Sequence, residues 1–168
     1  MSNVLFIHGA GPNILLGGAL ETLRNQTIAE FGNKIYAPPA VDWTETGLIG
    51  RYLDKWKDVQ ILVGLSCGCS TINAIAQSRP KERVPFAMYC SPSRFCSLGY
   101  VPPNVERAVQ ATSNNWDGWN LGGGKIVQRS SSGSPVDVIT TGYGHISSPL
   151  HPSVKKRLFD EIRLTLAA

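Results

Sequence analysis

Short apolar runs, each followed by a turn and then by a segment of helical spacing, recur along the whole chain. The strongest run covers residues 59–64, and others cover residues 4–7, 34–37, 84–90 and 136–141. Runs of four to eight residues bounded by Gly and Pro are typical of buried parallel strands. Segments with helical spacing lie between or after them, at residues 15–31, 47–56, 71–77 and 153–166. Strands that alternate with helices predict an α/β fold with a largely parallel sheet.

The length of the chain fits one domain. Its 168 residues are within the usual size of a single domain, and no linker or internal repeat interrupts the alternation. Residues 106–112 fit either a strand or a helical turn, because apolar and polar residues alternate there only briefly. We therefore expect a single domain over residues 1–168, with about six mostly parallel strands flanked by helices.

The charge of the chain does not indicate a polyanionic partner. The formal net charge is +4 and the isoelectric point is about 9.0, so the chain is mildly basic. The densest basic cluster is Lys155, Lys156 and Arg157, and no aromatic residue is interleaved with it. We interpret this cluster as a solvated face of the last helix rather than as a nucleic-acid patch. We expect no nucleic-acid partner.

The first apolar run and the spacing of the cysteines predict a cytoplasmic location. The first apolar run is too short for a signal peptide, and no stretch approaches the ~20 apolar residues of a membrane helix. Cys67, Cys69, Cys90 and Cys96 match neither a small disulfide framework nor a usual zinc spacing. We interpret all four as free thiols in a reducing compartment. A cytoplasmic protein with no membrane span is expected, although a phage or virus product released by lysis would share these features.

The sequence Gly64-Leu65-Ser66-Cys67-Gly68 matches the pattern G-x-S-x-G. In that pattern the serine occupies a sharp strand-to-helix turn, and the glycines let strand and helix pass closely while the hydroxyl is exposed above the sheet. The pentapeptide alone is weak evidence, because a tight turn with an incidental serine has the same letters. Here a clear apolar strand precedes it and a plausible helix follows it. Cys67 is the less favoured nucleophile, because the apex belongs to Ser66.

With this context the chain resembles the α/β-hydrolase superfamily, and in particular its compact, lidless serine hydrolases such as esterases, lipases and cutinases. His8-Gly9-Ala10-Gly11 follows the first apolar strand, where the family has an H-G motif that begins the oxyanion loop. The resemblance implies that the backbone N–H groups of Ala10 and Cys67 form the oxyanion hole. It also implies a minimal fold with no cap domain and with an open site.

The resemblance further implies a catalytic triad. A Gly-His pair after the last strand, here Gly144-His145, is where the family has its catalytic histidine. A serine hydroxyl needs such a base to take its proton. In the family the acid lies between the serine and the histidine, in a loop before the final strand, and Asp117 has that position. Asp117 as a side-chain cap of a turn is a close alternative.

The other acids and histidines fit the triad less well. Of the other acids between Ser66 and His145, none fits the position that the family gives the triad acid: Glu82, Glu106 and Asp137. His8 belongs to the oxyanion loop, where a turn-stabilising role is favoured. His151 precedes Pro152 at the start of the last helix and is interpreted as a capping or docking residue.

These residues predict a serine hydrolase that cleaves carboxylic esters through an acyl-enzyme. We expect no metal or organic cofactor, a small-molecule or lipid-like ester as substrate, and a monomer or weak dimer. A thioesterase, amidase or acyltransferase would use the same triad. The alternative from another class is a non-catalytic binding module built on a hydrolase fold.

Overall fold

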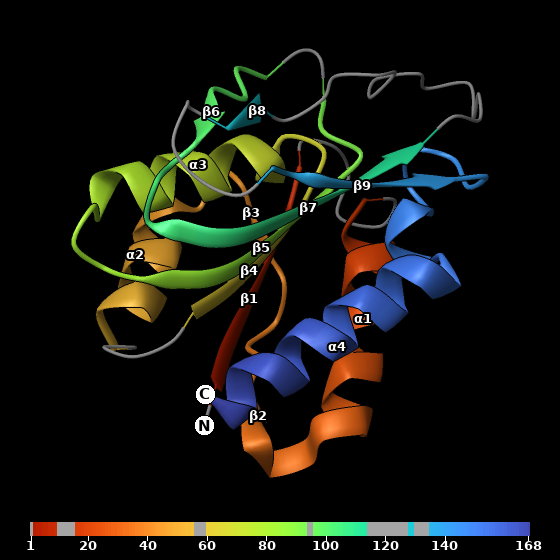
Figure 1. Ribbon diagram of the computed structural model, residues 1–168, viewed down its shortest axis with the longest axis horizontal. Coiled ribbons are helices and arrows are strands. Elements are labelled where there is room, and N and C mark those ends of the chain that lie inside the picture. The colour runs from red at the N-terminus through yellow and green to blue at the C-terminus, as the bar shows by residue number, and fades with distance from the viewer. Residues whose placement is uncertain (1, 10–15, 56–59, 94–95, 114–127, 130–134) are drawn as a thin grey trace.

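The computed structural model describes residues 2–9, 16–55, 60–93, 96–113, 128–129 and 135–168 (Figure 1). The first half of the chain contains β1 (Ser2–His8), α1 (Leu16–Phe31), the 3₁₀ turn η1 (Gly32–Lys34), β2 (Ile35–Tyr36), β3 (Val41–Asp42), α2 (Thr46–Lys55), β4 (Gln60–Leu65) and α3 (Gly68–Ser78). The second half contains β5 (Val84–Cys90), β6 (Tyr100–Val101), β7 (Val105–Ser113), β8 (Gln128–Arg129), β9 (Asp137–Thr141), η2 (Ser148–Leu150) and α4 (Pro152–Ala167).

An open parallel sheet of seven strands organises the molecule. Its order is β2-β1-β4-β5-β7-β9, and β3 also pairs with β1 beyond the end of β2. Every recorded pairing is parallel, and β1 meets β4 with Ile7 opposite Gly64. The short strands β6 and β8 form a separate parallel pair. The predicted α/β class with a mostly parallel sheet is therefore confirmed, and residues 106–112 belong to strand β7 rather than to a helical turn.

The order of the strands contains one reversal of direction. From β1 the chain moves outward to β2 and β3 and then returns to the other side of β1, where it forms β4. It continues from there through β5, β7 and β9. In open α/β sheets, ligands bind outside the carboxyl ends of the strands where such a reversal occurs. Here that place is the gap between the carboxyl ends of β1 and β4.

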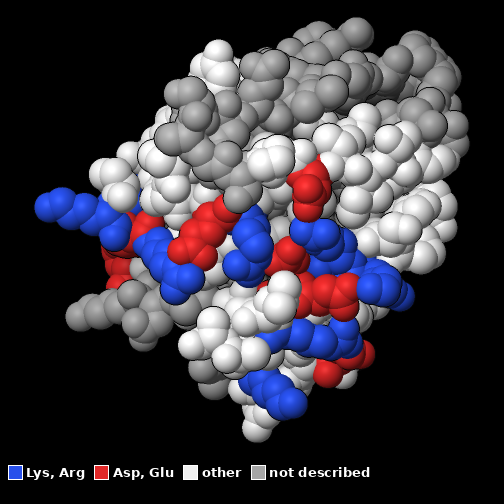
Figure 2. Space-filling view, viewed as in Figure 1, with Lys and Arg blue, Asp and Glu red and all other residues white. Residues whose placement is uncertain are grey.

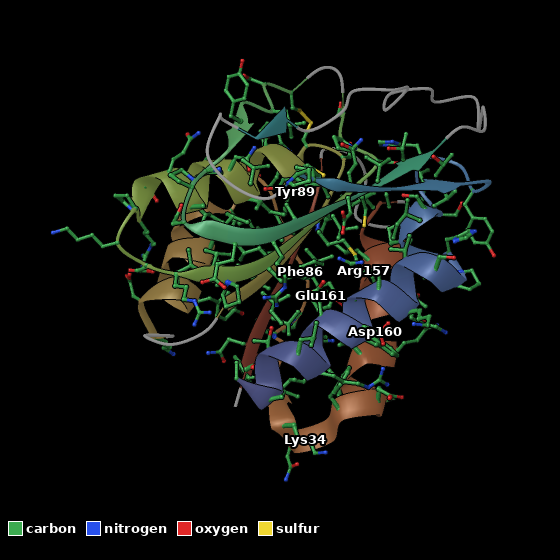
Figure 3. The ribbon with its side chains drawn as sticks, in the orientation of Figure 1. Lys34, Phe86, Tyr89, Arg157, Asp160 and Glu161 are labelled. Carbon is green, nitrogen blue, oxygen red and sulfur yellow. A yellow bond between two sulfur atoms is a disulfide. The ribbon has the colours of Figure 1, made fainter. Side chains whose placement is uncertain are left out.

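Helices cover both faces of the sheet because strand side chains point alternately to each face. Figure 1 shows α1 and α4 on one face and α2 and α3 on the other. The core on the first face, called the α1/α4 core below, includes Phe6, Leu23, Val63, Leu65, Phe86, Cys90 and Leu158. The core on the second face includes Leu5, Leu53, Leu62, Ile72 and Tyr89. Phe86 and Tyr89 accordingly lie on opposite faces of β5 (Figure 3).

Acidic side chains accompany the basic cluster on α4. Lys156 Nζ lies 2.6 Å from Asp160 Oδ2, and an Arg157 guanidinium nitrogen lies 2.7 Å from Asp137 Oδ2. Arg157 also lies 3.0 Å from Glu161, which is buried and also contacts Arg107 (Figure 3). Figure 2 shows Lys and Arg interleaved with Asp and Glu over this face. Because the charges are mixed, this face resembles an ordinary solvated surface more than an anion-binding patch.

The start of β1 and the end of α4 lie near each other. Ser2 pairs with Ile35 in β2, and the preceding residue, Lys34, lines a surface hollow together with Ala167. Figure 1 shows the two chain ends close together, at the edge of the sheet opposite the carboxyl ends of the strands.

Candidate active site

Strand β4 and helix α3 are joined by only two residues, Ser66 and Cys67. Ser66 takes the left-handed conformation, with φ of 58°. Its N–H donates to the carbonyl of Cys90 at 3.0 Å, and its own carbonyl accepts from the N–H of Cys69 at 3.1 Å. A left-handed residue with a Cβ costs roughly 1–2 kcal/mol, so the surrounding bonds must hold Ser66 in place.

A second strained serine lies at the end of the next strand. Among the described residues, the non-glycine positions with positive φ are Ser66 and Ser91, and Ser91 has φ of 41°. Ser91 follows β5, which pairs directly with β4, and its N–H donates to the carbonyl of Ala111 at 2.8 Å. Backbone strain of this kind concentrates at functional sites. Both strained residues lie at the carboxyl edge of the sheet.

Three glycines make room for the turn at Ser66. A Cβ on Gly68 would lie 2.1 Å from the carbonyl oxygen of Ile7, and one on Gly64 would lie 2.8 Å from the backbone of Gly68. A Cβ on Gly9 would lie 2.6 Å from both the Cβ of Ser66 and the backbone nitrogen of Cys67. The two glycines of G-x-S-x-G thus have the steric role that the pattern predicts, and Gly9 brings the end of β1 against the same turn.

The backbone around Ser66 suits a developing negative charge. Cys67 immediately precedes the first turn of α3, and a helix N-terminus carries a partial positive charge from its free N–H groups. Gly9 lies against the nitrogen of Cys67, at the reversal point between β1 and β4. The nitrogen of Cys67, one of the two predicted oxyanion donors, thus lies at the start of α3 and against Gly9. Ala10, the other predicted donor, lies outside the described residues.

His145 lies at the same edge of the sheet, after β9, and only 2% of its surface is exposed. The turn that holds it is closed by two bonds from Ser148, whose N–H donates to the Gly144 carbonyl at 3.0 Å and whose Oγ donates to the His145 carbonyl at 3.3 Å. The next residue, Ile146, packs against the α1/α4 core, which also contains Leu65 and Cys90. Ser66 and His145 thus both lie at the carboxyl edge of the sheet, where β5 and β7 separate the strand that precedes Ser66 from the strand that precedes His145. Asp117 lies outside the described residues.

The three acids that fit the triad position poorly form ion pairs with arginines. Glu82 pairs with Arg79, Glu106 with Arg83, and Asp137 with Arg157. The hydrogen bond from Arg83 lowers the pKa of Glu106, which therefore stays ionised on the surface. Glu106 also lies near the start of β7, far along the strand from the carboxyl edge. Each of the three carboxylates is thus paired with an arginine.

The other two histidines have distinct roles. His151 caps α4: its Nδ1 accepts from the N–H of Ser153 at 3.2 Å, as the sequence predicted. His8 is buried and its Nδ1 lies 3.6 Å from Oδ2 of Asp42, a contact that the sequence analysis missed. No motif marks Asp42, and β3 is only two residues long. The sequence offered one weak indication of this contact: Asp42 directly follows the apolar residue Val41, shortly after a Pro-Pro pair.

The prediction that all four cysteines are free thiols is wrong. Cys67 and Cys96 form a disulfide, with their Cα atoms 5.5 Å apart. That distance is in the usual range for a disulfide. Sequence spacing could not reveal it, because each cysteine follows a different strand, and the parallel pairing of β4 with β5 brings the two together.

Cys69 and Cys90 are free and buried. The Cys69 thiol donates to the carbonyls of Gly64 and Cys90, both at 3.4 Å. Burial raises the pKa of Cys90 to about 12, and burial together with the nearby Cys90 raises the pKa of Cys69 well above its usual range. A thiolate is the reactive form of cysteine, so neither side chain is suited to nucleophilic attack. Cys69 is therefore a buried packing residue.

One further bond holds the segment after β5 near the elbow, and a second bond, from β5 itself, orients its donor, Asn73. The Asn73 side-chain amide donates to the Leu98 carbonyl at 2.5 Å, and Tyr89 Oη donates to Asn73 Oδ1 at 2.7 Å. The Cys67–Cys96 disulfide fixes the same segment at its start. The predicted open site is not evident at Ser66, of which 3% is exposed. The nucleophile candidate is instead screened from bulk water.

No metal site accompanies these residues: the described ranges hold no group of three or more His, Cys, Asp or Glu side chains arranged to bind one. Within the same ranges, no helix is long and apolar enough to cross a membrane. No family model, no curated protein and no solved structure compared with this chain matches it.

Proposed function

We propose that the protein is a serine hydrolase that cleaves carboxylic esters through an acyl-enzyme, with Ser66 as the nucleophile. The left-handed conformation of Ser66 carries this proposal. The residue sits between a buried strand and the N-terminus of α3, at the reversal point of the sheet. A tight turn with an incidental serine needs neither the strained φ nor glycines on three sides.

In this proposal each of the named groups has a defined role in the reaction. His145 takes the proton of Ser66 while Oγ attacks the ester carbonyl, and then gives that proton to the departing alcohol. The N–H groups of Cys67 and Ala10 bind the oxygen of the tetrahedral intermediate. Water, activated by His145, then cleaves the acyl-enzyme and releases the acid. Asp117 holds the imidazole in the required tautomer and stabilises its charged form.

The fold family and the substrate class are part of the same proposal. We infer a compact α/β-hydrolase fold with no cap domain, because the G-x-S-x-G turn, the H-G motif and the late Gly-His pair follow strands β4, β1 and β9 of one parallel sheet. The substrate class is a small or lipid-like ester. The bonds that fix the segment after β5 support a rigid wall beside the elbow rather than a moving lid.

Labelling of the intact protein with a fluorophosphonate, mapped by mass spectrometry, tests the proposal. We expect label on Ser66, none in Ser66→Ala, and a rate at least ~10²-fold lower in His145→Ala, because the base is lost. His151→Ala is the matched control, since it removes a histidine that caps α4 instead. A panel of p-nitrophenyl esters and thioesters then defines the acyl preference. Folded protein that takes up no label would exclude the proposed function.

A further inference from the structure

Ser91 lies directly beside Ser66 and has the same backbone conformation, yet it has no part in the proposed triad. Leu65 of β4 pairs with Cys90 of β5, so the two serines that follow are neighbours across the pairing. Both are left-handed, with φ of 58° for Ser66 and 41° for Ser91. Their hydroxyl groups therefore start from adjacent strand ends at the carboxyl edge of the sheet.

The same type of backbone bond holds each serine against the next strand. The N–H of Ser66 donates to the Cys90 carbonyl at 3.0 Å, and the N–H of Ser91 donates to the Ala111 carbonyl at 2.8 Å. Cys90 is itself opposite Ala111 in the pairing of β5 with β7. The distance between the backbones of the two serines is thus set by the spacing of adjacent parallel strands, about 4.8 Å.

The Ser91 hydroxyl group is buried without a hydrogen-bond partner. Ser91 is 1% exposed, and within the part of the chain that the structure describes its Oγ makes no hydrogen bond. A buried polar group that lacks a partner costs free energy, and so does a side chain at positive φ. Glycine at this position would avoid both costs. A bond that the hydroxyl group makes when a ligand is bound explains a serine here better than the turn alone does.

A substrate of Ser66 is the ligand that comes closest to Ser91. The two residues are closed off from water to nearly the same extent, since Ser66 is 3% exposed. A substrate that reaches Ser66 therefore enters at the edge where Ser91 is the neighbour in register. The acyl part of an ester stays bonded to Ser66 through both steps of the proposed reaction, whereas the alcohol departs after the first. A bond from Ser91 to the acyl part is thus available throughout the cycle.

We propose that Ser91 is a specificity-determining residue whose hydroxyl group binds an oxygen substituent of the acyl chain, and that the substrate is a 2-hydroxyacyl or 3-hydroxyacyl ester. This inference rests on the proposed function and names its substrate class. A hydroxyl group on the acyl chain both donates and accepts, as Ser91 Oγ does, so either can be the donor. On C2 or C3, its oxygen can approach Ser91 Oγ to about 2.8 Å. Substituents farther along the chain are carried past the span of about 4.8 Å between the two backbones.

Paired substrates separate this role from a general effect on the elbow. The test compares kcat/KM for p-nitrophenyl 3-hydroxybutanoate and butanoate, and for p-nitrophenyl 2-hydroxypropanoate and propanoate, in the wild type and in Ser91→Ala. Because a hydroxyl substituent changes the intrinsic reactivity of an ester, the quantity of interest is the change in each ratio between the two proteins. We expect at least one ratio to fall by roughly 3–10-fold in Ser91→Ala, as for loss of one neutral hydrogen bond. The unsubstituted esters should keep their kcat/KM within about twofold, because Ser91 has no bond to them.

Two further variants complete the experiment. Ser91→Gly removes the hydroxyl group and also relieves the positive φ, so it should show the same loss of preference even if Ser91→Ala folds poorly. Ser78→Ala is the matched control. It removes a serine hydroxyl group that donates to the Ile75 carbonyl at the end of α3, away from the carboxyl edge, and should leave both ratios unchanged.

The failure of this inference can be told apart from the failure of the proposed function. Ratios that change less than about twofold in both Ser91 variants, or an equal fall in kcat/KM for substituted and unsubstituted esters, would overturn the specificity role while Ser66 still labels. A wild-type protein that neither labels at Ser66 nor hydrolyses any of these esters would overturn the proposed function and, with it, this inference.

Discussion

Breaking the Cys67–Cys96 disulfide should destabilise the protein substantially. The bridge closes a loop with a sequence separation of 29 residues. In the chain-entropy treatment, a loop of this length restricts the unfolded chain by about 12 cal/mol/K, which is about 3.6 kcal/mol at 25 °C. For a domain of this size each kcal/mol shifts the melting temperature by roughly 2–4 °C. Cys96→Ser should therefore lower the melting temperature by roughly 7–14 °C.

The measurement is thermal and urea unfolding followed by circular dichroism, with and without dithiothreitol. Cys96 is the better position to replace, because Cys67 is also the proposed oxyanion donor. Reductant should shift the wild-type melting temperature toward that of Cys96→Ser and leave the variant unchanged. A thiol titration of the unreduced, unfolded chain should give the two free cysteines, Cys69 and Cys90. Four reactive thiols, or a wild-type melting temperature insensitive to reductant, would refute the reasoning.

Four other predictions concern the elbow and its thiols. Gly68→Ala should cost roughly 3 kcal/mol or more in urea unfolding, since its Cβ would lie 2.1 Å from a backbone oxygen, whereas Gly18→Ala in α1, with open space around it, should gain roughly 0.5–1 kcal/mol. Equal effects of the two would contradict the close approach. Ser66→Gly should be about 1 kcal/mol more stable than Ser66→Ala, the reverse of the usual order, because only the alanine retains a Cβ at positive φ. Cys69 and Cys90 should not react with Ellman's reagent in the native protein at pH 8. Because the pKa of Cys90 is raised from 9.0 to about 12 on folding, its contribution to stability is complete below pH 9 and lost as the pH rises toward 12. The urea midpoint should fall in that range, and less steeply in Cys90→Ala.

The sequence predicted those parts of the fold in which a local pattern determines the structure. The apolar runs predicted β1, β4, β5 and β9 to within a few residues. β1, β4 and β5 are buried on both faces of a parallel sheet, whereas β9 is a largely exposed edge strand. The turn at Ser66 was predicted because the glycines that it requires sterically are part of the pattern G-x-S-x-G, which can be recognised in the sequence. The two-residue strand β3 has no periodicity to detect and was missed, whereas the run at residues 34–37 predicted the equally short β2.

The missed features are contacts between segments that are distant in the sequence. The Cys67–Cys96 disulfide depends on which strand neighbours β4, and the His8–Asp42 pair depends on β3 lying beside β1. Neither neighbour can be inferred from spacing alone, because a parallel sheet can be ordered in several ways. The roles of Ala10 and Asp117 stay predictions.

The closeness of the start of β1 and the end of α4 has a consequence for engineering the chain. A short linker could join these ends, and new termini could be opened in the turn between α3 and β5, which lies at the same edge of the sheet. Both changes would be made on the side of the sheet away from Ser66. The order in which the segments are synthesised could thus be changed while the carboxyl edge of the sheet keeps its strand neighbours. Carrier proteins or solid supports attached at either end would face away from Ser66.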